Sequence, residues 1–448
     1  MWKTLQSAFR IKDVRRRILY IFMMLVVVRI GCQLPIPGVN GEYIKQWFES
    51  QSSDAFNFFS AFTGGSFEQM SIFALNITPY ITSSIIMQLL TIAIPALEEM
   101  HKDGEDGRKK ITMITRYLTV GLSLFQSIAM VIAFGRQGLI EAMVEGSGAS
   151  TFEKVMAGII AVACLTAGSA LLMWIGEQIT VKGVGNGISI VLTINIVSSM
   201  PGDFVSLFQT FVLGKTLAKG ALAAFIIVAV VLVVVVFVLI LNDGIRKIPV
   251  QYSKKMQGRK MVGGQSSTIP MKVNTAGVIP IIFASSLMSF PVIIASFFGK
   301  GNGTGIGSQI LRAMSSNNWC NPNQPVYSLG LLVYIVLVVF FAYFYTSITF
   351  NPIEIADNIR KQGGFIPGIR PGKPTTEYLN KLLNYIIFIG AVGLIIVAVI
   401  PIFFNGVFGA KVSFGGTSVI IVVSVVLETL KQIESLMLVR NYKGFLNN

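Results

Sequence analysis

The residue types that most often perform catalysis or bind metals are scarce in this chain. Its 448 residues contain one histidine, His101, which lies in a charged loop, and three widely separated cysteines, Cys32, Cys164 and Cys320. Zinc sites and Ser-His catalytic sets therefore lack their parts. The cysteines imply no disulfide framework, and we expect them to be small buried hydrophobic residues. The chain also has no Walker motif and no HExxH motif, so an enzyme is a poor interpretation.

Charged side chains are nearly absent from the apolar segments, where an ion-coupled transporter would need them. Such transporters usually bind the driving ion at carboxylates near the middle of the membrane. No charged residue occurs in 72–94, 221–241, 273–299, 327–353 or 382–410. Arg29 lies toward the outer end of the first apolar segment, and Glu428, Lys431 and Glu434 lie toward the inner end of the last. A solute transporter is therefore a weaker alternative, and an intramembrane protease lacks a nucleophile–base pair and a metal set.

The composition indicates that the chain lies mostly in a membrane. Hydrophobic residues make up 53% and charged residues 13%, against about 25% charged residues in soluble domains. The chain is nevertheless basic, with 36 Lys and Arg against 21 Asp and Glu and a formal net charge of +15. This positive charge must lie outside the apolar part of the bilayer.

Apolar segments long enough to cross a bilayer, about 20 residues each, recur along the chain. We predict ten transmembrane helices at approximately 18–34, 72–94, 112–134, 155–175, 187–203, 220–241, 274–298, 327–350, 381–404 and 415–437. The first has the basic and apolar parts of a signal peptide. However, Arg29 interrupts it and no small-residue cleavage site follows, so we expect it to remain as a helix.

The distribution of Lys and Arg predicts the orientation of the chain. With ten spans and a cytoplasmic N-terminus, 27 of the 36 Lys and Arg lie on the cytoplasmic side, as the positive-inside rule requires. Acidic residues divide more evenly between the two sides. We therefore expect a multi-pass protein with both termini in the cytoplasm and most of its net positive charge on that face.

Ten spans also suggest two halves of five spans, residues 1–203 and 204–448. An odd number of spans per half makes the second half insert in the opposite orientation. NITPYITSS in the second span and GVIPIIFAS in the seventh support this weakly, because they align on Pro79 and Pro280. If the similarity is real, it marks two proline-kinked helices that face each other across the centre; chance is an equal alternative.

Two further features suit a passage for something larger than an ion. FNFFSAFTGGSFEQM, which precedes the second span, is amphipathic, contains Gly64 and Gly65, and must lie at the membrane interface or fold back into a cavity. IRKIPVQYSKKMQGRK carries six basic residues and no acid, and NIRKQGGFIPGIRPGKPT adds four. An interfacial linker and a plain orientation signal are the simpler alternatives. The functional one is docking of a large anionic partner, such as ribosomal RNA or an acidic cytoplasmic motor.

At these segments the chain resembles the SecY family, the channel subunits of the bacterial protein translocase, which are related to the Sec61 α subunit. The most specific blocks are SIFALNITPYITSSIIMQLL, MWIGEQITVKGVGNGISI, QGRKMVGGQSSTIPMKVNTAGVIPIIFASS, FNPIEIADNIRKQGGFIPGIRPGKPT and FGGTS. One departure is Asn76, where the family usually has glycine. The resemblance implies an all-α polytopic membrane protein. Its ten helices would form two inverted five-helix halves like a clamshell, with a re-entrant plug helix at about 57–71.

The resemblance also implies a channel without intrinsic catalysis, cofactor or metal. It would pass unfolded secretory polypeptides across the plasma membrane and release transmembrane segments into lipid through a lateral gate. Carried onto this chain, the apolar pore ring of the family is Ile77, Ile81, Leu192, Ile196, Ile282 and Ile421. The spacing of 77/81 and of 192/196 places each pair on one helix face. An apolar ring can exclude ions by dewetting and offers a passing polypeptide no hydrogen bonds.

The remaining site residues also come from the resemblance. The plug would include Phe62, Gly64, Gly65, Ser66, Phe67 and Met70. Candidate polar residues of the lateral gate are Gln88, Gln126 and Asn274, although any of them could simply satisfy an interhelical hydrogen bond.

The two cytoplasmic loops, 242–273 and 351–380, resemble those that bind the SecA ATPase or the ribosome. The basic residues in them are Arg246, Lys247, Lys254, Lys255, Arg259, Lys260, Arg360, Lys361, Arg370 and Lys373. Other implied partners are the small membrane subunits SecE and SecG, signal peptides, nascent polypeptides and membrane lipid. No sequence-specific nucleic-acid binding is expected.

Overall fold

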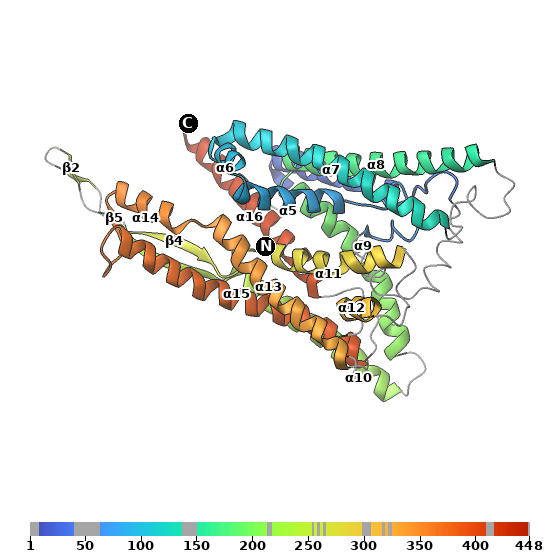
Figure 1. Cartoon of the computed structure of the whole chain (residues 1–448). Coiled ribbons are helices and arrows are strands. Elements are labelled where there is room, and N and C mark those ends of the chain that lie inside the picture. The colour runs from blue at the N-terminus through green and yellow to red at the C-terminus, as the bar shows by residue number, and fades with distance from the viewer. Residues whose placement is uncertain are drawn as a thin grey trace.

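The computed structural model is built almost entirely of helices (Figure 1). It describes residues 9–39, 63–136, 150–212, 217–252, 255–257, 260–262, 266–297, 306–315, 319–320, 325–408 and 416–446.

Each of the ten predicted spans contains a helix. These are α2 (Lys12–Gln33), α5 (Thr78–Ala93), α7 (Gly104–Arg136), α8 (Thr151–Lys182), α9 (Gly187–Phe211), α10 (Leu217–Asp243), α11 (Ile279–Phe297), α13 (Leu329–Thr349), α15 (Lys373–Phe408) and α16 (Gly416–Leu446). Among the described residues, six helices are long and apolar enough to cross a membrane. The number is seven if α5 and α6 (Pro95–Lys102), which meet at 106°, form one broken span. The structure therefore shows a multi-pass helical membrane protein, and the full count of ten stays a prediction.

Several helices extend well beyond the apolar segments that predicted them. α7 begins at Gly104 and α15 at Lys373, eight residues before the predicted spans in both cases. The predicted loop 351–380 is also partly helical, because it contains α14 (Pro352–Lys361) and the first turns of α15. Hydropathy identifies only the apolar residues that lie in the membrane. A helix can continue beyond them into polar sequence, as α7 and α15 do.

The helix of the second span begins later than predicted, at Thr78 rather than near residue 72. Asn76 has a positive φ of 51°, and residues before it form turns. Pro79 lies in the first helical turn, where its missing N–H has no intrahelical acceptor to lose. The proline therefore starts a helix, and the predicted kink at this position is wrong.

The second half of the chain repeats this arrangement. α11 begins at Ile279, so Pro280 also lies in a first turn, and Gly277 has a φ of 64°. Gly277 aligns with Asn76 when the two prolines are superposed. The similarity between the two segments is thus accompanied by the same backbone conformation, a left-handed residue three positions before a helix-starting proline.

A small antiparallel sheet interrupts the helices, and the prediction of an all-α chain omits it. β1 (Ile245–Tyr252) pairs with β4 (Ser266–Lys272) on one edge and with β5 (Gly364–Phe365) on the other. Ile248 and Val250 alternate with exposed residues and pack on α14 and α15, which is the two-residue period of a half-buried strand. β2 (Lys255–Gln257) and β3 (Lys260–Val262) form a separate hairpin.

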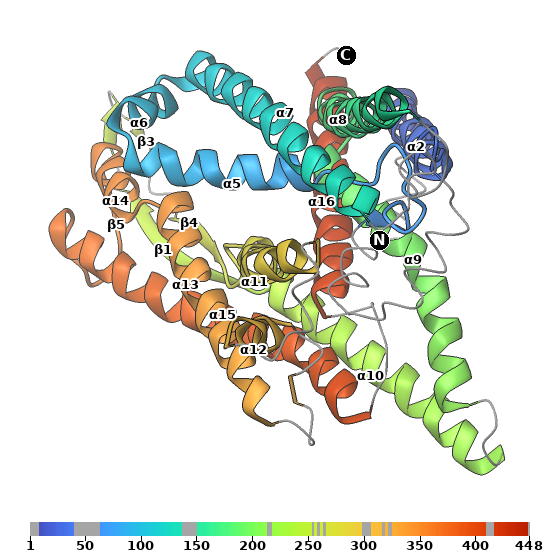
Figure 2. The same cartoon turned by 45° about the vertical axis from the view of Figure 1, so that its right-hand side comes forward.

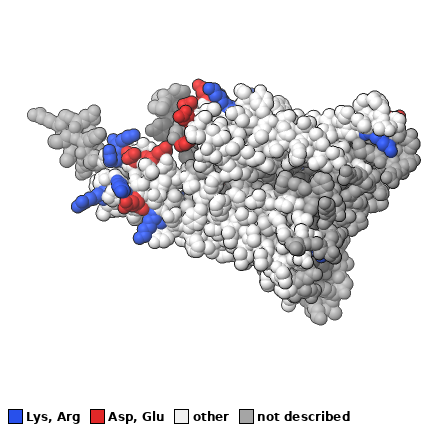
Figure 3. Space-filling model, viewed as in Figure 1, with Lys and Arg blue, Asp and Glu red and all other residues white. Residues whose placement is uncertain are grey.

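The helices of the first and second halves pack as two groups (Figures 1 and 2). The helix α16 lies between them and contacts α2, α9, α10 and α15. Figure 3 shows charged side chains gathered at the ends of the molecule, with a long uncharged middle. Two shorter helical segments, α12 (Ile306–Met314) and η3 (Pro325–Ser328), pack beside α13. Cys32 is buried as expected, whereas Cys164 and Cys320 are half-buried, and all three are free.

Candidate functional site

The six residues predicted to form the pore ring meet in one apolar cluster. Ile77 caps α5, and the others lie on α5, α9, α11 and α16: Ile81, Leu192, Ile196, Ile282 and Ile421. Four of the six are buried, whereas Ile81 and Ile282 are half-buried and pack against the others. The cluster also includes residues of α2 and α8, so helices from both halves of the chain contribute to it.

The segment that precedes α5 lies beside this cluster and is irregular. Residues 63–77, here called the turn segment, contain Gly64, Gly65 and Met70 with positive φ angles of 64°, 81° and 45°. Repeated left-handed residues prevent a continuous right-handed helix. In the predicted plug helix at about 57–71, Thr63 is helical and residues 64–70 form turns, whereas residues 57–62, which include Phe62, lie outside the described residues.

Apolar side chains anchor the turn segment to its surroundings. Phe67 and Met70 are buried in a cluster with Phe134 of α7, and the ring centroids of Phe67 and Phe134 are 6.1 Å apart. The segment also pairs with the chain that follows α2, because Ile36 donates its N–H to the Met70 carbonyl across 3.1 Å. Ser66 is buried and donates its hydroxyl to the carbonyls of Thr63 and Phe73.

Arg29 of α2 joins the turn segment to α9. Its Nη1 donates to Ser198 Oγ at 2.9 Å and to the Gly64 carbonyl at 3.4 Å. The Ser198 hydroxyl in turn donates to the carbonyl of Asn195. Sequence reasoning treated Arg29 only as an interruption of the first span. The signal for a specific role was available, since a charged residue inside an apolar segment needs a partner.

Two buried asparagines connect the start of α5 to α9. Asn195 Nδ2 donates to Asn76 Oδ1 at 3.2 Å, and the two side chains are 0% and 4% exposed. Asn195 Oδ1 has no hydrogen-bond partner among the described residues. Asparagine tolerates the left-handed conformation better than most residues with a side chain, so Asn76 can replace the glycine usual in the family. Each asparagine immediately precedes a residue of the predicted ring, Ile77 or Ile196.

The three candidate gate residues have different surroundings. Asn274 is buried and donates to Asn242 Oδ1 at 2.8 Å, and Asn242 donates to Ser424 of α16 at 2.7 Å. Asn274 therefore makes a side-chain hydrogen bond within the second half of the chain. Gln88 on α5 and Gln126 on α7 are half-buried, and these two helices pack against each other.

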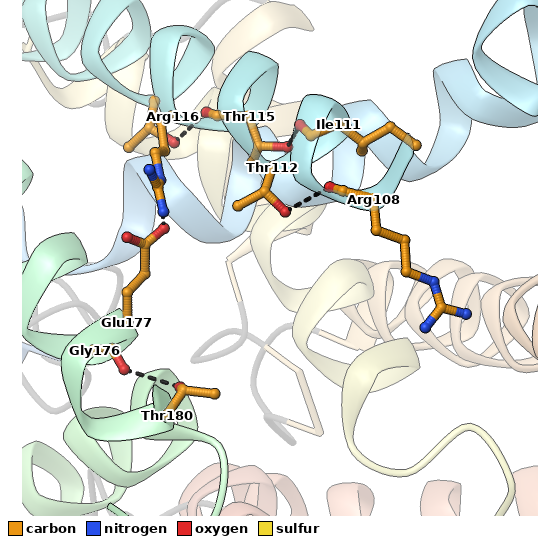
Figure 4. A network of polar contacts seen from close by, with 9 residues as sticks. Arg108, Ile111, Thr112, Thr115, Arg116, Gly176, Glu177 and Thr180 are labelled. Carbon is orange, nitrogen blue, oxygen red and sulfur yellow. Dashed lines mark hydrogen bonds and ion pairs between the residues drawn. The ribbon is translucent and has the colours of Figure 1, made fainter. Parts of the chain in front are cut away.

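An ion pair that sequence reasoning missed links α7 to α8. Arg116 Nε donates to Glu177 Oε1 at 2.8 Å, with side-chain exposures of 50% and 17% (Figure 4). The threonines around it, such as Thr112 and Thr180, donate to carbonyls four residues earlier in their own helices. Arg116 and Glu177 thus pair with each other, and these threonine hydroxyls bind carbonyls of their own helices. Among the described residues, no group of three His, Cys, Asp or Glu could hold a metal ion.

The described basic residues of the two loops predicted to be cytoplasmic converge at one end of the molecule. Arg246 and Lys247 are exposed on β1, and Arg360 and Lys361 are exposed at the end of α14. The sheet brings the loops together because β1 pairs with β5 at Gln251 and Phe365. Arg370 is exposed in the turn that leads to α15, and Lys373 is exposed at the first position of that helix.

The other predicted docking residues are described less completely. Lys255 and Lys260 lie on β2 and β3, and Lys254 and Arg259 fall outside the described residues. Figure 3 shows Lys and Arg at this end of the molecule, with acidic side chains among them.

A protein-family model described as SecY matches residues 71–430 of the chain. The chain belongs to the SecY family. Relatives similar over their whole length support this. It is 43% identical to protein translocase subunit SecY of Streptomyces galbus over 443 residues, which cover 98% of each chain. It is 41% identical to that of Bacillus subtilis (strain 168) over 458 residues, which cover all of both chains.

Solved structures of the SecY and Sec61 type share the fold. One described as a protein-conducting channel is 18% identical, with a TM-score of 0.59 over 94% of this chain and 92% of that one. Sec61 in the canine ribosome-channel complex from the endoplasmic reticulum is 17% identical, with the same TM-score and coverage. Members of the SecY family are translocation channel subunits, so this chain is a component of protein transport and not an enzyme.

Proposed function

We propose that the chain is the central channel subunit of a plasma-membrane protein translocase. It passes unfolded secretory polypeptides through a ring formed by Ile77, Ile81, Leu192, Ile196, Ile282 and Ile421. The observation that supports this proposal is that all six side chains, from the N-cap of α5 and from α5, α9, α11 and α16, belong to one apolar cluster. These residues are far apart in the sequence, so they come into one cluster only when the whole chain folds.

The ring closes by apolar contact. Buried isoleucine and leucine side chains offer no hydrogen bonds to water or ions, so a narrow ring of them dewets and excludes both. A polypeptide that pushes the side chains apart meets the same lack of hydrogen bonds and slides past without being held. The turn segment, with Gly64, Gly65, Ser66, Phe67 and Met70 of the predicted plug, covers the ring from the outer side.

The ten helices form two inverted halves, residues 1–203 and 204–448, with both termini in the cytoplasm. Support comes from the shared geometry of Asn76–Pro79 and Gly277–Pro280. The positive-inside distribution of Lys and Arg sets the orientation. α5 and α7 of the first half then face α11 and α13 of the second. The seam between them, with Gln88, Gln126 and Asn274 nearby, is the lateral gate that releases transmembrane segments into lipid.

The convergent basic end is the docking surface for the partners that supply energy. Its exposed Arg246, Lys247, Arg360, Lys361 and Arg370 present positive charge on two connected loops, which suits the phosphates of ribosomal RNA or an acidic face of the SecA ATPase. A solved relative, Sec61, is described in complex with a ribosome. SecE and SecG pack on the exposed apolar helices within the membrane.

A reconstitution experiment tests the channel function directly. The complex is purified from native membranes with its bound subunits and inserted into liposomes with SecA and ATP. A secretory precursor should become protected from added protease, and a cysteine placed at Ile282 should crosslink to the precursor in transit. A cysteine at the lipid-facing Val233, which is 66% exposed, is the control and should not crosslink. Flux of a small solute without transport of the precursor would contradict the proposal.

A further inference from the structure

Arg29 lies where three separate parts of the chain meet. It comes from α2, its first partner Ser198 belongs to α9, and its second partner, the Gly64 carbonyl, belongs to the turn segment. The partners are 169 and 35 positions away in sequence, so the contact exists only in the folded arrangement. The two acceptors, Ser198 Oγ and the Gly64 carbonyl oxygen, are both neutral. A guanidinium has five N–H donors, and it can bind two partners at once.

The two hydrogen bonds of Arg29 differ in length. The bond to Ser198 is 2.9 Å, which is ordinary for an N–H···O bond, whereas the bond to Gly64 is 3.4 Å and beyond the usual range. Ser198 is in turn fixed to its own helix by its bond to the Asn195 carbonyl. Arg29 is therefore held firmly against α9 and reaches the turn segment by its longer, weaker bond. The weaker bond is the one that breaks first when the segment moves.

The turn segment fits closely against α9 at this point. A Cβ atom added to Gly64 would lie 2.9 Å from Ser198 Oγ and 3.0 Å from both Arg29 Nη1 and Asn195 Cα. Only a glycine allows this approach. A Cβ atom added to the next residue, Gly65, would have no atom within 4 Å. The close contact is therefore confined to Gly64, whose carbonyl binds Arg29.

We propose that Arg29 is a positioning residue that holds the turn segment closed against α9, and thereby sets how strong a signal a polypeptide needs to open the channel. The inference rests on the proposed channel function. Opening requires the Gly64 carbonyl to leave Arg29, while the Arg29–Ser198 bond keeps the guanidinium on the channel wall. Each departure leaves the half-buried guanidinium with one acceptor fewer, which favours return of the segment.

The test uses the whole purified complex carrying Arg29→Met, which keeps the length of the side chain and removes its charge. Two readouts are measured: resting ion conductance in planar bilayers, and export of reporters with an intact or a defective signal sequence. Arg29→Met should raise the conductance and the export of the defective reporter about tenfold, the effect of losing one hydrogen bond to a charged group. Export of the intact reporter should stay unchanged.

Three further variants separate positioning from simple damage to the fold. Arg29→Lys keeps the charge and should restore most of the wild-type behaviour. Ser198→Ala removes the wall-side partner with little change of volume and should act in the same direction as Arg29→Met. Ser199→Ala is the matched control, because its hydroxyl donates only to the Ile196 carbonyl of its own helix; it should leave both readouts unchanged.

The outcomes distinguish the inference from the function on which it rests. If the wild-type complex exports the intact reporter but Arg29→Met and Ser198→Ala both show wild-type conductance and wild-type rejection of the defective reporter, the role of Arg29 is wrong and the channel stands. If the wild-type complex exports no reporter, the channel function itself fails. Equal effects of Ser198→Ala and Ser199→Ala would also overturn the inference.

Discussion

Asn195 donates its side-chain amide to Asn76 across 3.2 Å in a site that is almost completely buried. This bond joins α9 to the residue that immediately precedes Ile77, the N-cap of α5 and the first residue of the proposed ring. The backbone of Asn76 is left-handed, with a φ of 51°, so the position favours glycine on conformational grounds alone. An asparagine there gives up part of that backbone preference and gains an interhelical contact.

Asn76→Gly should therefore destabilise the protein although glycine suits the backbone better. The change removes the acceptor and leaves the Asn195 amide buried without a partner, at a cost of about 1–3 kcal/mol. Relief of left-handed strain offsets only part of this cost, because asparagine tolerates that conformation better than most residues and a new glycine also raises the conformational entropy of the unfolded chain. The net loss is measured as a lower midpoint of thermal unfolding of the purified complex.

A second substitution and a double-mutant cycle separate the two effects. Asn76→Ala should be worse than Asn76→Gly by about 1–2 kcal/mol, because alanine also strains at positive φ. Combining Asn76→Gly with Asn195→Ala removes both partners, and the combined loss should be smaller than the sum of the single losses. Additive losses would show that the hydrogen bond contributes nothing to stability.

Gly64 and Gly65 form a matched pair for testing the fit of the turn segment. Both have positive φ angles, 64° and 81°, so alanine at either position is strained. Only at Gly64 does the added Cβ also meet Ser198, Arg29 and Asn195. Gly64→Ala should therefore displace the segment and raise resting ion conductance well above that of Gly65→Ala. Equal conductance in the two variants would mean that the close approach to α9 has no part in closure.

Arg370→Glu tests the docking surface. Arg370 is exposed in the turn between β5 and α15, and its carbonyl accepts a hydrogen bond from Thr375 Oγ1 at 2.9 Å. Its guanidinium is therefore available to a partner while its backbone is fixed. The variant should insert normally into the membrane and lose most SecA-driven export, with weaker SecA binding that falls further as salt rises.

Lys154→Glu is the control for this charge reversal, because α8 begins at the opposite end of the molecule (Figure 1). It makes the same change of net charge away from the basic end. Normal SecA-driven export by Arg370→Glu, or an equal loss in Lys154→Glu, would contradict a specific docking role.

Hydropathy predicted where helices lie but not where they begin. The bilayer requires about 20 apolar residues per span, so every predicted interval contains a helix. The starts of α5 and α7 were missed for different reasons. The left-handed Asn76 delays α5, and the polar first turns of α7 carry it outside the apolar segment. The strand β1 was missed because its alternation is short and one of its two partners, β5, lies more than 100 residues along the chain.

The candidate site was predictable in its residue types and not in its contacts. The resemblance to the SecY family supplied the ring residues, and their i,i+4 spacing on two helices agreed with a common face. Nothing local in the sequence could pair Arg29 with Ser198 or Asn76 with Asn195, because each pair is separated by more than 100 residues. Such bonds depend on how three or four helices pack, which residue patterns within one helix do not encode.

Ile421 and Ile420 allow the ring to be tested against ordinary burial. Both are buried, at 3% and 0% exposure, and they are neighbours on α16. Ile421 packs in the cluster of ring residues, whereas Ile420 packs in the cluster formed by α10, α11, α13 and α15. Asparagine at either position buries an amide and should lower stability by about 1–3 kcal/mol.

Only Ile421→Asn should also change conduction. A polar group in the ring favours water there, so the ring no longer dewets completely. The variant should conduct ions at rest and accept precursors with weakened signal sequences, whereas Ile420→Asn should be less stable but closed. Planar-bilayer recordings and thermal unfolding of the same preparations give both quantities. Equal resting ion conductance in the two variants would mean that the leak comes from lost packing. The six residues would then be ordinary core residues and would not form a pore ring.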